Sequence, residues 1–206
     1  MRLAKEAWPF VAVAAAGSFI GLALGLYSVG IPLALLAAAV AFFFRDPERR
    51  LPEDADTVVS PADGTVVEFV PKEGGTHQIG VFLAPWNVHV NRVPYNGSVS
   101  AVRYQSGKFL AAFRQDAGLR NERNRVELAT PLGTMAVTQV AGWIARRIVC
   151  RLKEGDRVSR GERMGLIQFG SRVECELPPT VTPLVKEGDV VRGGETVIGR
   201  AKGGAP

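Results

Sequence analysis

The feature that most constrains the fold is a long apolar stretch near the start of the chain. Residues 7–44 contain no charged side chain and consist mostly of Ala, Leu, Val, Phe and Gly. A single membrane-spanning helix needs only about 20 apolar residues, so the stretch has room for more than one helix. The segment "YSVGIP", residues 27–32, interrupts it with a glycine and a proline. We therefore expect two helices, about residues 8–27 and 31–44, joined by a tight turn.

The second expected helix is short for a membrane. At about 1.5 Å per residue, residues 31–44 reach only about 21 Å, whereas the hydrocarbon core is about 30 Å thick. A shallow re-entrant hairpin, a tilted pair of helices and two full spans therefore all remain open.

Basic residues on both sides of the apolar stretch indicate its orientation. They are Arg2, Lys5, Arg45, Arg49 and Arg50. Because positive charges tend to stay on the cytoplasmic side, we expect an anchor in the cell membrane with the rest of the chain on the cytoplasmic face. A cleaved signal peptide is the alternative. However, the run is too long for its apolar region and ends in "FFFRDPERR" rather than at a small-residue cleavage site.

After an anchor and linker in residues 1–50, residues 51–206 indicate one β-rich domain. Short runs rich in Val and Ile, such as "TVVEFV", "HQIGVFL" and "TMAVTQV", alternate with turn pairs such as "DG" and "NG". Helical periodicity is confined to residues 108–120. The 23 glycines and 13 prolines suit such a strand-and-turn domain. The expected fold class is therefore all-β, a sandwich or partly closed barrel.

An internal repeat lies in the last third of the chain. "KEGDRVSRGERMG", which starts at Lys153, recurs 33 residues later as "KEGDVVRGGETVIG", which starts at Lys186. Each copy reads as a tight turn, a short strand, a second turn and a return strand, and such hairpins resemble those of biotinyl- and lipoyl-type β-sandwiches. "VVSPADGTVVEF", near Ser60, looks like a third related turn. With two clear copies, we expect a duplication inside one fold rather than a solenoid.

Charge and composition restrict the partners. The net charge of +5 and the pI of about 9.6 favour an anionic partner. No interleaved basic and aromatic pattern indicates nucleic acid, so the apolar stretch favours an acidic membrane surface instead. The sequence shows no cluster with metal-ligand spacing, and Cys150 and Cys175 are too few for a disulfide framework.

Few side chains can act as a base near neutral pH. His77 and His89 are the two histidines, and His89 alternates with Val88 and Val90 in a predicted strand. A structural and a catalytic role are equally open there. Asp63 belongs to an Asp-Gly pair, which by itself indicates an ordinary turn.

Two groups of arginines are candidates for binding an anion. Arg146 and Arg147 follow each other inside an apolar run, so one of them must point inward or into a cleft. The segment "NERNR", with Asn121, Arg123 and Arg125, is the second candidate, although it reads equally well as a solvated loop.

The pair Gly170-Ser171, inside "LIQFGSRVECELP", allows a more specific reaction. A serine hydroxyl can attack the carbonyl carbon that precedes it, and a glycine there offers no Cβ to block the attack. If a base then removes the α-proton of the serine, the new ester breaks by β-elimination and the chain end hydrolyses to a pyruvoyl group. Such a ketone takes the electron-sink role that pyridoxal phosphate has elsewhere. Because Gly-Ser pairs are common, the pair alone is also compatible with a bend in a strand.

Five motifs together resemble one enzyme family. "SPADGTV", "NVHVNRVPYNGSV", "NERN", "GWIARRIVC" and "RGERMGLIQFGSRVECELP" occur in the order and approximate spacing of phosphatidylserine decarboxylase proenzymes, closest to the short bacterial and archaeal branch. The resemblance implies pyruvoyl-dependent decarboxylation of phosphatidylserine to phosphatidylethanolamine and CO2 through a Schiff base, without a metal or pyridoxal phosphate. It also implies self-cleavage between Gly170 and Ser171. The products would be a β chain, residues 1–170, and an α chain, residues 171–206, whose Ser171 becomes the pyruvoyl group.

The resemblance also implies roles for single residues. It implies an Asp-His-Ser arrangement for self-processing, here Asp63, His89 and Ser171. Longer relatives carry a second histidine three positions after the first and use it as the base, whereas this chain has Arg92 there. Either His89 serves both processing and decarboxylation, or processing runs without a dedicated imidazole. The candidates for binding the phosphodiester of the anionic serine phospholipid are Arg146, Arg147, Asn121 and Arg123.

Two rival functions stay open on the sequence. A non-catalytic, membrane-tethered carrier would present a modifiable lysine at a hairpin tip. Lys153 and Lys186 precede turns but lack the flanking residues of carrier motifs. A pyruvoyl decarboxylase of a soluble amino acid would leave the apolar stretch without a purpose. The sequence does not choose between diacyl and archaeal ether lipids, or between a monomer and a homo-oligomer.

Overall fold

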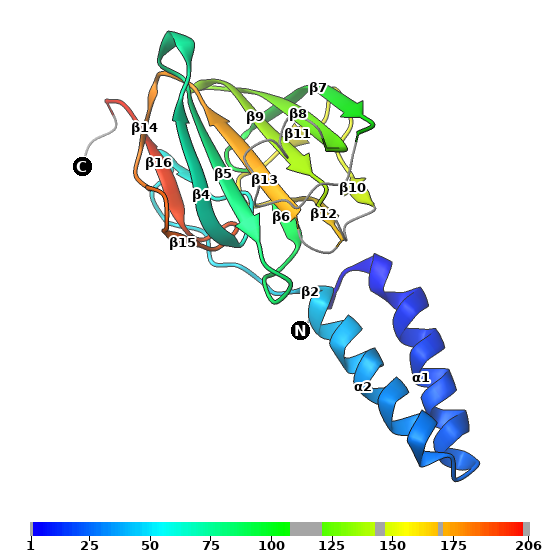
Figure 1. The fold of residues 1–206 in the computed structure, drawn as a ribbon. Helices are drawn as coiled ribbons and strands as arrows, with labels where there is room; N and C mark the ends of the chain where they lie inside the picture. The colour runs from blue at the N-terminus through cyan, green and yellow to red at the C-terminus, as the bar shows by residue number, and fades with distance from the viewer. Residues whose placement is uncertain (1, 108–120, 143–146, 169–170, 204–206) are drawn as a thin grey trace. The chain divides into compact units, whose positions relative to one another are not determined.

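The structure is a computed structural model that describes residues 2–107, 121–142, 147–168 and 171–203 (Figure 1). It divides into two compact units, Met1–Glu48 and Arg49–Pro206. The expected helical segment at residues 108–120 falls outside the described residues.

The first unit is an apolar helical hairpin, which confirms that part of the expected fold. Its elements are β1 (Arg2–Leu3), the 3-10 helix η1 (Lys5–Ala7), α1 (Trp8–Ala23), α2 (Tyr27–Phe43) and β2 (Arg45–Asp46), and β1 pairs with β2. The helical stretch Lys5–Ala23 is long and apolar enough to cross a membrane, and α2 is a shorter apolar helix of 17 residues.

The position expected for the turn of the hairpin, residues 27–32, is wrong. The turn lies at residues 24–26, and α2 already includes the expected turn. Gly25, with a φ of +74°, supplies the left-handed conformation that ends α1. Pro32 lies inside α2, where it removes one backbone hydrogen bond without ending the helix.

Gly30, the other half of the turn signal, serves helix packing instead. A Cβ at Gly30 would lie 2.7 Å from Leu22 Cγ, and a Cβ at Gly21 would lie 3.1 Å from the Cα of Gly30. Ser18 Oγ donates a hydrogen bond of 2.8 Å to the Gly30 carbonyl. Small residues allow two helices in apolar surroundings to approach this closely.

The second unit is built from strands, which confirms the all-β class. They are β3 (Thr57–Val59), β4 (Gly64–Pro71), β5 (His77–Leu83), β6 (Val90–Arg92), β7 (Gly97–Gln105), β8 (Arg123–Thr130), β9 (Gly133–Val140), β10 (Ile148–Cys150), β11 (Arg157–Val158), β12 (Arg163–Ile167), β13 (Ser171–Leu177), β14 (Val181–Pro183), β15 (Val190–Val191) and β16 (Val197–Ala201), with the 3-10 helix η2 (Glu73–Gly75) between β4 and β5. Eight strands form one curled sheet in the order β11-β7-β8-β9-β13-β5-β4-β15 (Figure 1). Two three-stranded sheets, β10-β12-β6 and β14-β16-β3, complete the unit.

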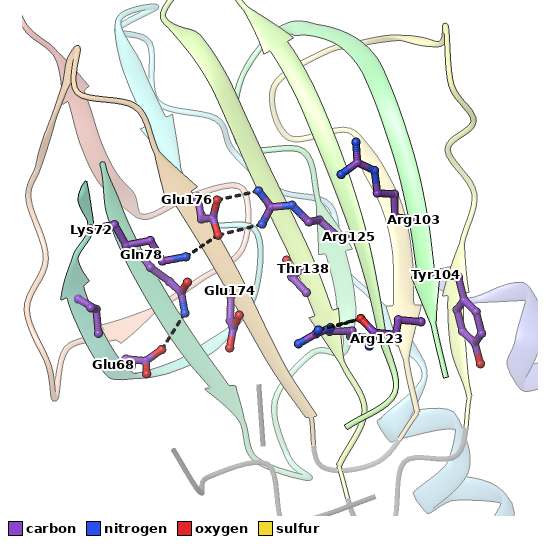
Figure 2. A pocket seen from close by; sticks show the side chains of 12 residues that line it. Glu68, Lys72, Gln78, Arg103, Tyr104, Arg123, Arg125, Thr138, Glu174 and Glu176 are labelled. Atoms are coloured by element: carbon purple, nitrogen blue, oxygen red, sulfur yellow. Dashed lines mark hydrogen bonds and ion pairs between the residues drawn. The ribbon is translucent and has the colours of Figure 1, made fainter. Parts of the chain in front are cut away.

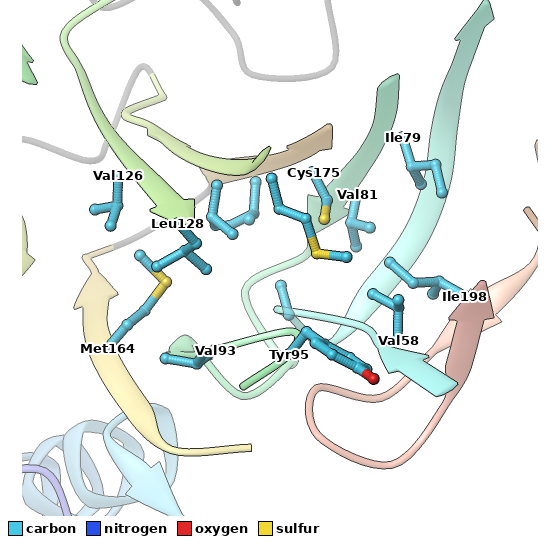
Figure 3. Packing of buried hydrophobic residues seen from close by; sticks show 14 of the residues in the cluster. Val58, Ile79, Val81, Val93, Tyr95, Val126, Leu128, Met164, Cys175 and Ile198 are labelled. Atoms are coloured by element: carbon cyan, nitrogen blue, oxygen red, sulfur yellow. The ribbon is translucent and has the colours of Figure 1, made fainter. Parts of the chain in front are cut away.

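The eight-stranded sheet has two unlike faces, because side chains alternate along each strand. On β13, Val173 and Cys175 are buried in the hydrophobic core, where they meet side chains from both small sheets (Figure 3). We call this side the core face. Arg172, Glu174 and Glu176 alternate with them on the opposite side, which we call the groove face.

The 33-residue repeat in the sequence is also a repeat in the structure. The Gly188 amide donates to the Val66 carbonyl (2.8 Å), and the Gly155 amide donates to the Val99 carbonyl (2.9 Å). The two donors are 33 residues apart in the sequence, and so are the two acceptors. The strand after each of these turns, β15 or β11, forms an edge strand of the large sheet and pairs with β4 or β7, respectively. The duplication therefore places its two copies at opposite edges of one sheet.

The sequence suggested that the segment near Ser60 is a third copy of this turn, but the structure gives it another role. Gly194 N donates to the Ser60 carbonyl, and Gly161 N donates to the Val93 carbonyl, both at 2.8 Å. The Ser60 segment is therefore the partner of one copy, and the Val93 segment takes the same place in the other. Each repeat is built from two segments that are distant in the sequence.

Candidate active site

Ser171 is the first residue of β13 and is fully buried. It pairs with Leu83, the last residue of β5, and its side chain lies on the core face because it alternates with Arg172. Its hydroxyl has no hydrogen-bond partner among the described residues. A buried polar group without a partner is unfavourable for stability, which marks this serine as a candidate for function rather than for a structural bend.

Two chain connections meet at this end of the large sheet. One joins β5 to β6 and the other joins β12 to β13, while β5 pairs with β13 and β6 pairs with β12. The Ile167 amide donates to the His89 carbonyl (3.4 Å). The structure therefore brings His89 next to the segment that leads into Ser171. Gly170 itself lies outside the described residues.

His89 is buried, and its ring is oriented by a tight turn. Nδ1 lies 3.0 Å from the Asn87 carbonyl, and since a carbonyl only accepts, Nδ1 carries the proton of this bond. In the neutral ring the lone pair is therefore on Nε2, the atom that can act as a base. Asn87 Oδ1 accepts a bond of 2.9 Å from the Ala84 amide, which fixes the turn.

Asp63 lies directly before β4, at the same end of the sheet, and its carboxylate is already bound. Arg49 Nη2 donates to both carboxylate oxygens (2.9 and 2.8 Å), and the Gly193 amide donates to Oδ1 (2.8 Å). Among the described residues, no recorded hydrogen bond joins Asp63 to His89. The structure thus brings the segments that carry Ser171, His89 and Asp63 to one end of the large sheet.

The bond from Gly193 to Asp63 has a counterpart in the other copy of the repeat. There the Arg160 amide donates to Asn96 Oδ1 at 2.7 Å. The donors Gly193 and Arg160 are 33 residues apart, and so are the acceptors Asp63 and Asn96. An uncharged side chain therefore makes the same contact. The turn requires an acceptor at residue 63, whereas the negative charge and the ion pair with Arg49 are not needed for that contact.

Arg92 lies three positions after His89, where the resemblance would place a second histidine. It is buried, Nη1 donates to the Gly161 carbonyl (2.9 Å), and its Cδ packs beside the turn at Gly194. A guanidinium stays protonated, so Arg92 cannot act as a base. His89 is the histidine that the structure brings to this end of the sheet, because His77 begins β5 at the other end.

Two residues expected to bind the substrate lie near the start of β13. Asn121 is buried, and its side-chain amide donates to the carbonyl of Ala141 (2.7 Å), which is the residue directly after β9. Arg147 is exposed, and its carbonyl accepts a bond from the Gln168 amide (3.2 Å). Arg146 lies outside the described residues.

A third expected substrate residue, Arg123, lies on the groove face. It helps to line a groove of about 740 Å³ and holds Gln105 Oε1 with two bonds (3.0 and 2.7 Å) (Figure 2). Nearby, the bond from Arg125 lowers the pKa of Glu176 to about 2. Because this groove lies on the face opposite the Ser171 side chain, it is not the place where the serine would react.

Sequence reasoning missed a buried polar cluster on the core face. Gln139 Nε2 donates to Asn91 Oδ1 (2.9 Å), and Asn124 Nδ2 donates to Gln139 Oε1 (3.3 Å). Gln139 lies opposite Val173, one inward position from Ser171. Asn91 is fully buried, and its Nδ2 has no hydrogen-bond partner among the described residues. The signal was present in "TMAVTQV", where glutamine takes an inward position in the alternation.

The two cysteines are poor nucleophiles. Burial raises the pKa of the Cys175 thiol to about 12 and also raises that of Cys150. A thiol attacks as its thiolate, so we interpret both as packing residues. Among the described residues, no three His, Cys, Asp or Glu side chains lie together as metal ligands.

The fold and the site define a class of protein. It has an apolar helical hairpin and a β domain, and a central strand of that domain begins with a buried serine. The family described as phosphatidylserine decarboxylase matches the chain over residues 36–199.

Individual relatives agree with this match. The chain is 48% identical to the phosphatidylserine decarboxylase proenzyme of Chlorobium chlorochromatii over 164 residues, and this match covers 77% of each of the two chains. It is 43% identical over 209 residues to that of Magnetococcus marinus (98% of this chain, 96% of the relative). It is 44% identical over 211 residues to that of Pelobacter propionicus (96% of both). The chain belongs to the phosphatidylserine decarboxylase family, which confirms the resemblance and makes it an enzyme rather than a non-catalytic carrier.

Proposed function

We propose that the chain converts phosphatidylserine to phosphatidylethanolamine and CO2 with a pyruvoyl group made from its own Ser171. The observation that carries the proposal is the position of Ser171. It is fully buried, its hydroxyl has no partner among the described residues, and it begins a strand directly after Gly170. The relatives' name, proenzyme, supports a chain that must first be processed.

Processing begins with an attack of Ser171 Oγ on the carbonyl carbon of Gly170. The peptide C–N bond breaks, an ester forms, and the serine nitrogen becomes a free amine. Removal of the Ser171 α-proton then expels Oγ together with Gly170 as a carboxylate, which leaves dehydroalanine at the new chain end. Water adds to its imine form and ammonia leaves, so the ketone oxygen comes from water and no oxidant is needed.

We assign the base for the α-proton to His89. Its neutral ring carries a lone pair on Nε2, and its backbone lies against Ile167 in the segment that leads to the cut. Arg92 supplies no base, so the same imidazole would serve both processing and proton transfer during decarboxylation. Asp63, at the same end of the sheet, contributes a negative charge that favours the imidazolium.

Once formed, the pyruvoyl group supplies a ketone that condenses with the substrate amine and accepts the electrons released with CO2. The headgroup must be bound by other residues of the chain. We assign the buried Asn91 amide to a headgroup oxygen, and the exposed Arg147 to the phosphodiester. Asn121 and Arg123 are weaker candidates, since their side chains hold a carbonyl and a glutamine within the domain.

The two fragments would stay together after cleavage, because β13 is a central strand. It pairs with β5 on one side and β9 on the other, and both of these strands belong to residues 1–170. The last strand of the small fragment, β16, pairs with β3 of the large fragment. Separation would expose the core face to water, which burial of apolar surface opposes.

We also propose that the helical hairpin holds the domain at the cytoplasmic face of the cell membrane, where phospholipid headgroups are within reach. Its large apolar side chains are exposed, among them Trp8, Phe19 and Leu35, and the net charge of +5 favours anionic lipid.

The intact chain should therefore stay with membranes through an alkaline carbonate wash. Its release into the wash would contradict an inserted anchor.

Denaturing electrophoresis and intact mass of the purified protein test the proposed function. Cleavage after Gly170 would give fragments of about 18 and 4 kDa, at about 110 Da per residue for ordinary composition. The smaller fragment should be lighter by one ammonia than a fragment that begins with serine, and its N-terminus should resist Edman sequencing. An uncut chain that decarboxylates phosphatidylserine would overturn the proposal.

Asp63→Asn separates the charge of Asp63 from its turn contact. Asn96 makes the equivalent contact in the other repeat, so the domain should fold, while cleavage should slow by about tenfold because the imidazolium of His89 loses a favourable charge. Arg49→Gln is the matched control, since it breaks the same ion pair but leaves the carboxylate in place. Equal slowing in both variants would show that the ion pair, and not the charge of Asp63, is what processing needs.

A further inference from the structure

The largest fully buried side chain in the described part of the protein is that of Arg172, the residue after the reacting serine. It is 2% exposed and lies on the groove face, at the end of β13 where the cut is proposed. A guanidinium remains charged throughout the physiological range, and a buried charge is tolerated only when it is paired. Arg172 must therefore be held by its neighbours.

The groups around it lie on its own strand, on the adjacent strand β5 and on β4, the next strand beyond β5. Glu68 on β4 forms an ion pair with Arg172 Nη2. Glu174 on β13 lies 3.0 Å from Nε and forms an ion pair with it, although Nε makes no hydrogen bond with the described residues. Gly80 on β5 leaves the space for the guanidinium, since a Cβ there would come within 2.7 Å of Nη2. Gln78 donates to Glu68 Oε2 (3.0 Å) and so fixes that carboxylate. We call Arg172, Glu68, Glu174 and Gly80 the arginine clamp.

Cleavage changes what holds this part of the chain. In the sheet, Arg172 pairs with Phe82 of β5 on one side and with Val140 of β9 on the other. In the uncut chain, residue 171 is also held by its peptide bond to Gly170. After the cut, residue 171 is the free end of the small fragment, and only the strand pairing and the arginine clamp remain to hold it.

We propose that Arg172 is a positioning residue that fixes the pyruvoyl end of the small fragment on the large fragment. This rests on the proposed cleavage at Gly170-Ser171. The clamp crosses the cut, because Arg172 belongs to the small fragment whereas Glu68 and Gly80 belong to the large one. Residues 171 and 172 point to opposite faces of the sheet. The clamp therefore holds the chain end from the groove face and leaves free the opposite face, on which the side chain of residue 171 lies.

Such a clamp matters because a free strand end tends to fray. A displacement of about 1 Å at a reacting group can lower a rate by about a hundredfold. Withdrawing the guanidinium would leave a buried cation and two largely buried carboxylates without their partners. The clamp thus opposes fraying at the residue whose carbonyl must meet the substrate.

Arg172→Gln tests this role, with Glu176→Gln as the matched control. Glu176 also lies on the groove face of β13 and also joins the two fragments, through an ion pair with Arg125, but it is farther from the cut. In cleaved protein, Arg172→Gln should lower kcat by about tenfold or more at unchanged KM, as expected for a misplaced reacting group. Glu176→Gln should keep the kcat of the wild type.

Hydrogen exchange gives a readout that does not depend on turnover. In cleaved Arg172→Gln, the amides of residues 172–174 should exchange faster than in the wild type, while the far end of β13 stays protected. Arg172→Lys should restore kcat in part, because it keeps the charge with fewer donors. Gly80→Ala, which displaces the guanidinium without removing it, should reproduce both losses.

The wild-type chain separates this proposal from the proposed function. A wild type that is active without a cut at Gly170 overturns the proposed function and, with it, the positioning role. If the wild type is cut and active but Arg172→Gln matches Glu176→Gln in kcat and in exchange, the positioning role alone is refuted. If Arg172→Gln does not fold, Gly80→Ala and Glu68→Gln, which retain the arginine, decide by the same two measurements.

Discussion

Ser171→Ala is expected to remain a single chain of 22.1 kDa and to have no decarboxylase activity. The substitution removes the side-chain oxygen that attacks the Gly170 carbonyl, so neither the ester nor the pyruvoyl group can form. The effect should exceed that of any other single change, because the cut and the ketone depend on the same atom. Electrophoresis, intact mass and release of CO2 from phosphatidylserine vesicles measure it.

The uncut Ser171→Ala protein should fold as well as the wild type. Oγ makes no hydrogen bond with the described residues, so the free energy of unfolding should be unchanged or slightly higher. Thermal unfolding therefore separates a loss of chemistry from a loss of fold. Ser171→Cys is the matched variant, since its thiol can form a thioester and should restore slow cutting. A Ser171→Ala chain that still gives two fragments would contradict the proposed role.

The β domain could be predicted because its strands follow local rules. Runs such as "TMAVTQV" alternate inward and outward side chains, and glycine-containing turns separate them. The repeated turns are also local: the Lys153 amide donates to Asp156 Oδ2 (2.7 Å), and the Lys186 amide donates to Asp189 Oδ2 (2.9 Å). Such signals fix the ends of hairpins. They do not say which strands become neighbours, and the partnership of β13 with β5 and β9 appears only in the folded chain.

The helical hairpin shows where local rules fail. Gly30 and Pro32 form the stronger turn signal in the sequence, yet Gly25 makes the turn. Gly30 is small because α2 packs closely against Leu22 of α1. A glycine needed for close packing and a glycine needed for a turn look alike in a sequence.

The candidate site could be predicted only in part. Ser171 and His89 stand in recognisable motifs, and the structure brings their segments to one end of the large sheet. The ion pairs of Arg49 with Asp63 and of Arg172 with Glu68 each join separate segments of the chain. No spacing in the sequence indicates such partners, so nothing in the sequence marks the charge at residue 172 as a buried and paired one.

His89→Gln is expected to slow self-cleavage by about a hundredfold to ten-thousandfold, the usual contribution of a general base. Glutamine is polar and its amide can donate to the Asn87 carbonyl in place of Nδ1, but it offers no basic nitrogen. The fraction of uncut chain in a time course after synthesis measures the effect.

The other histidine provides the control for His89→Gln. His77 begins β5, whereas Leu83 at the far end of the same strand pairs with Ser171, so His77→Gln should cut at the wild-type rate. His89→Gln protein that has been cut during long incubation then separates two steps: a low kcat means that one imidazole serves both, and a normal kcat means that it serves processing alone. Normal cutting with normal kcat would contradict both roles. In that case the α-proton would be removed without an imidazole, the alternative that Arg92 in place of a second histidine leaves open.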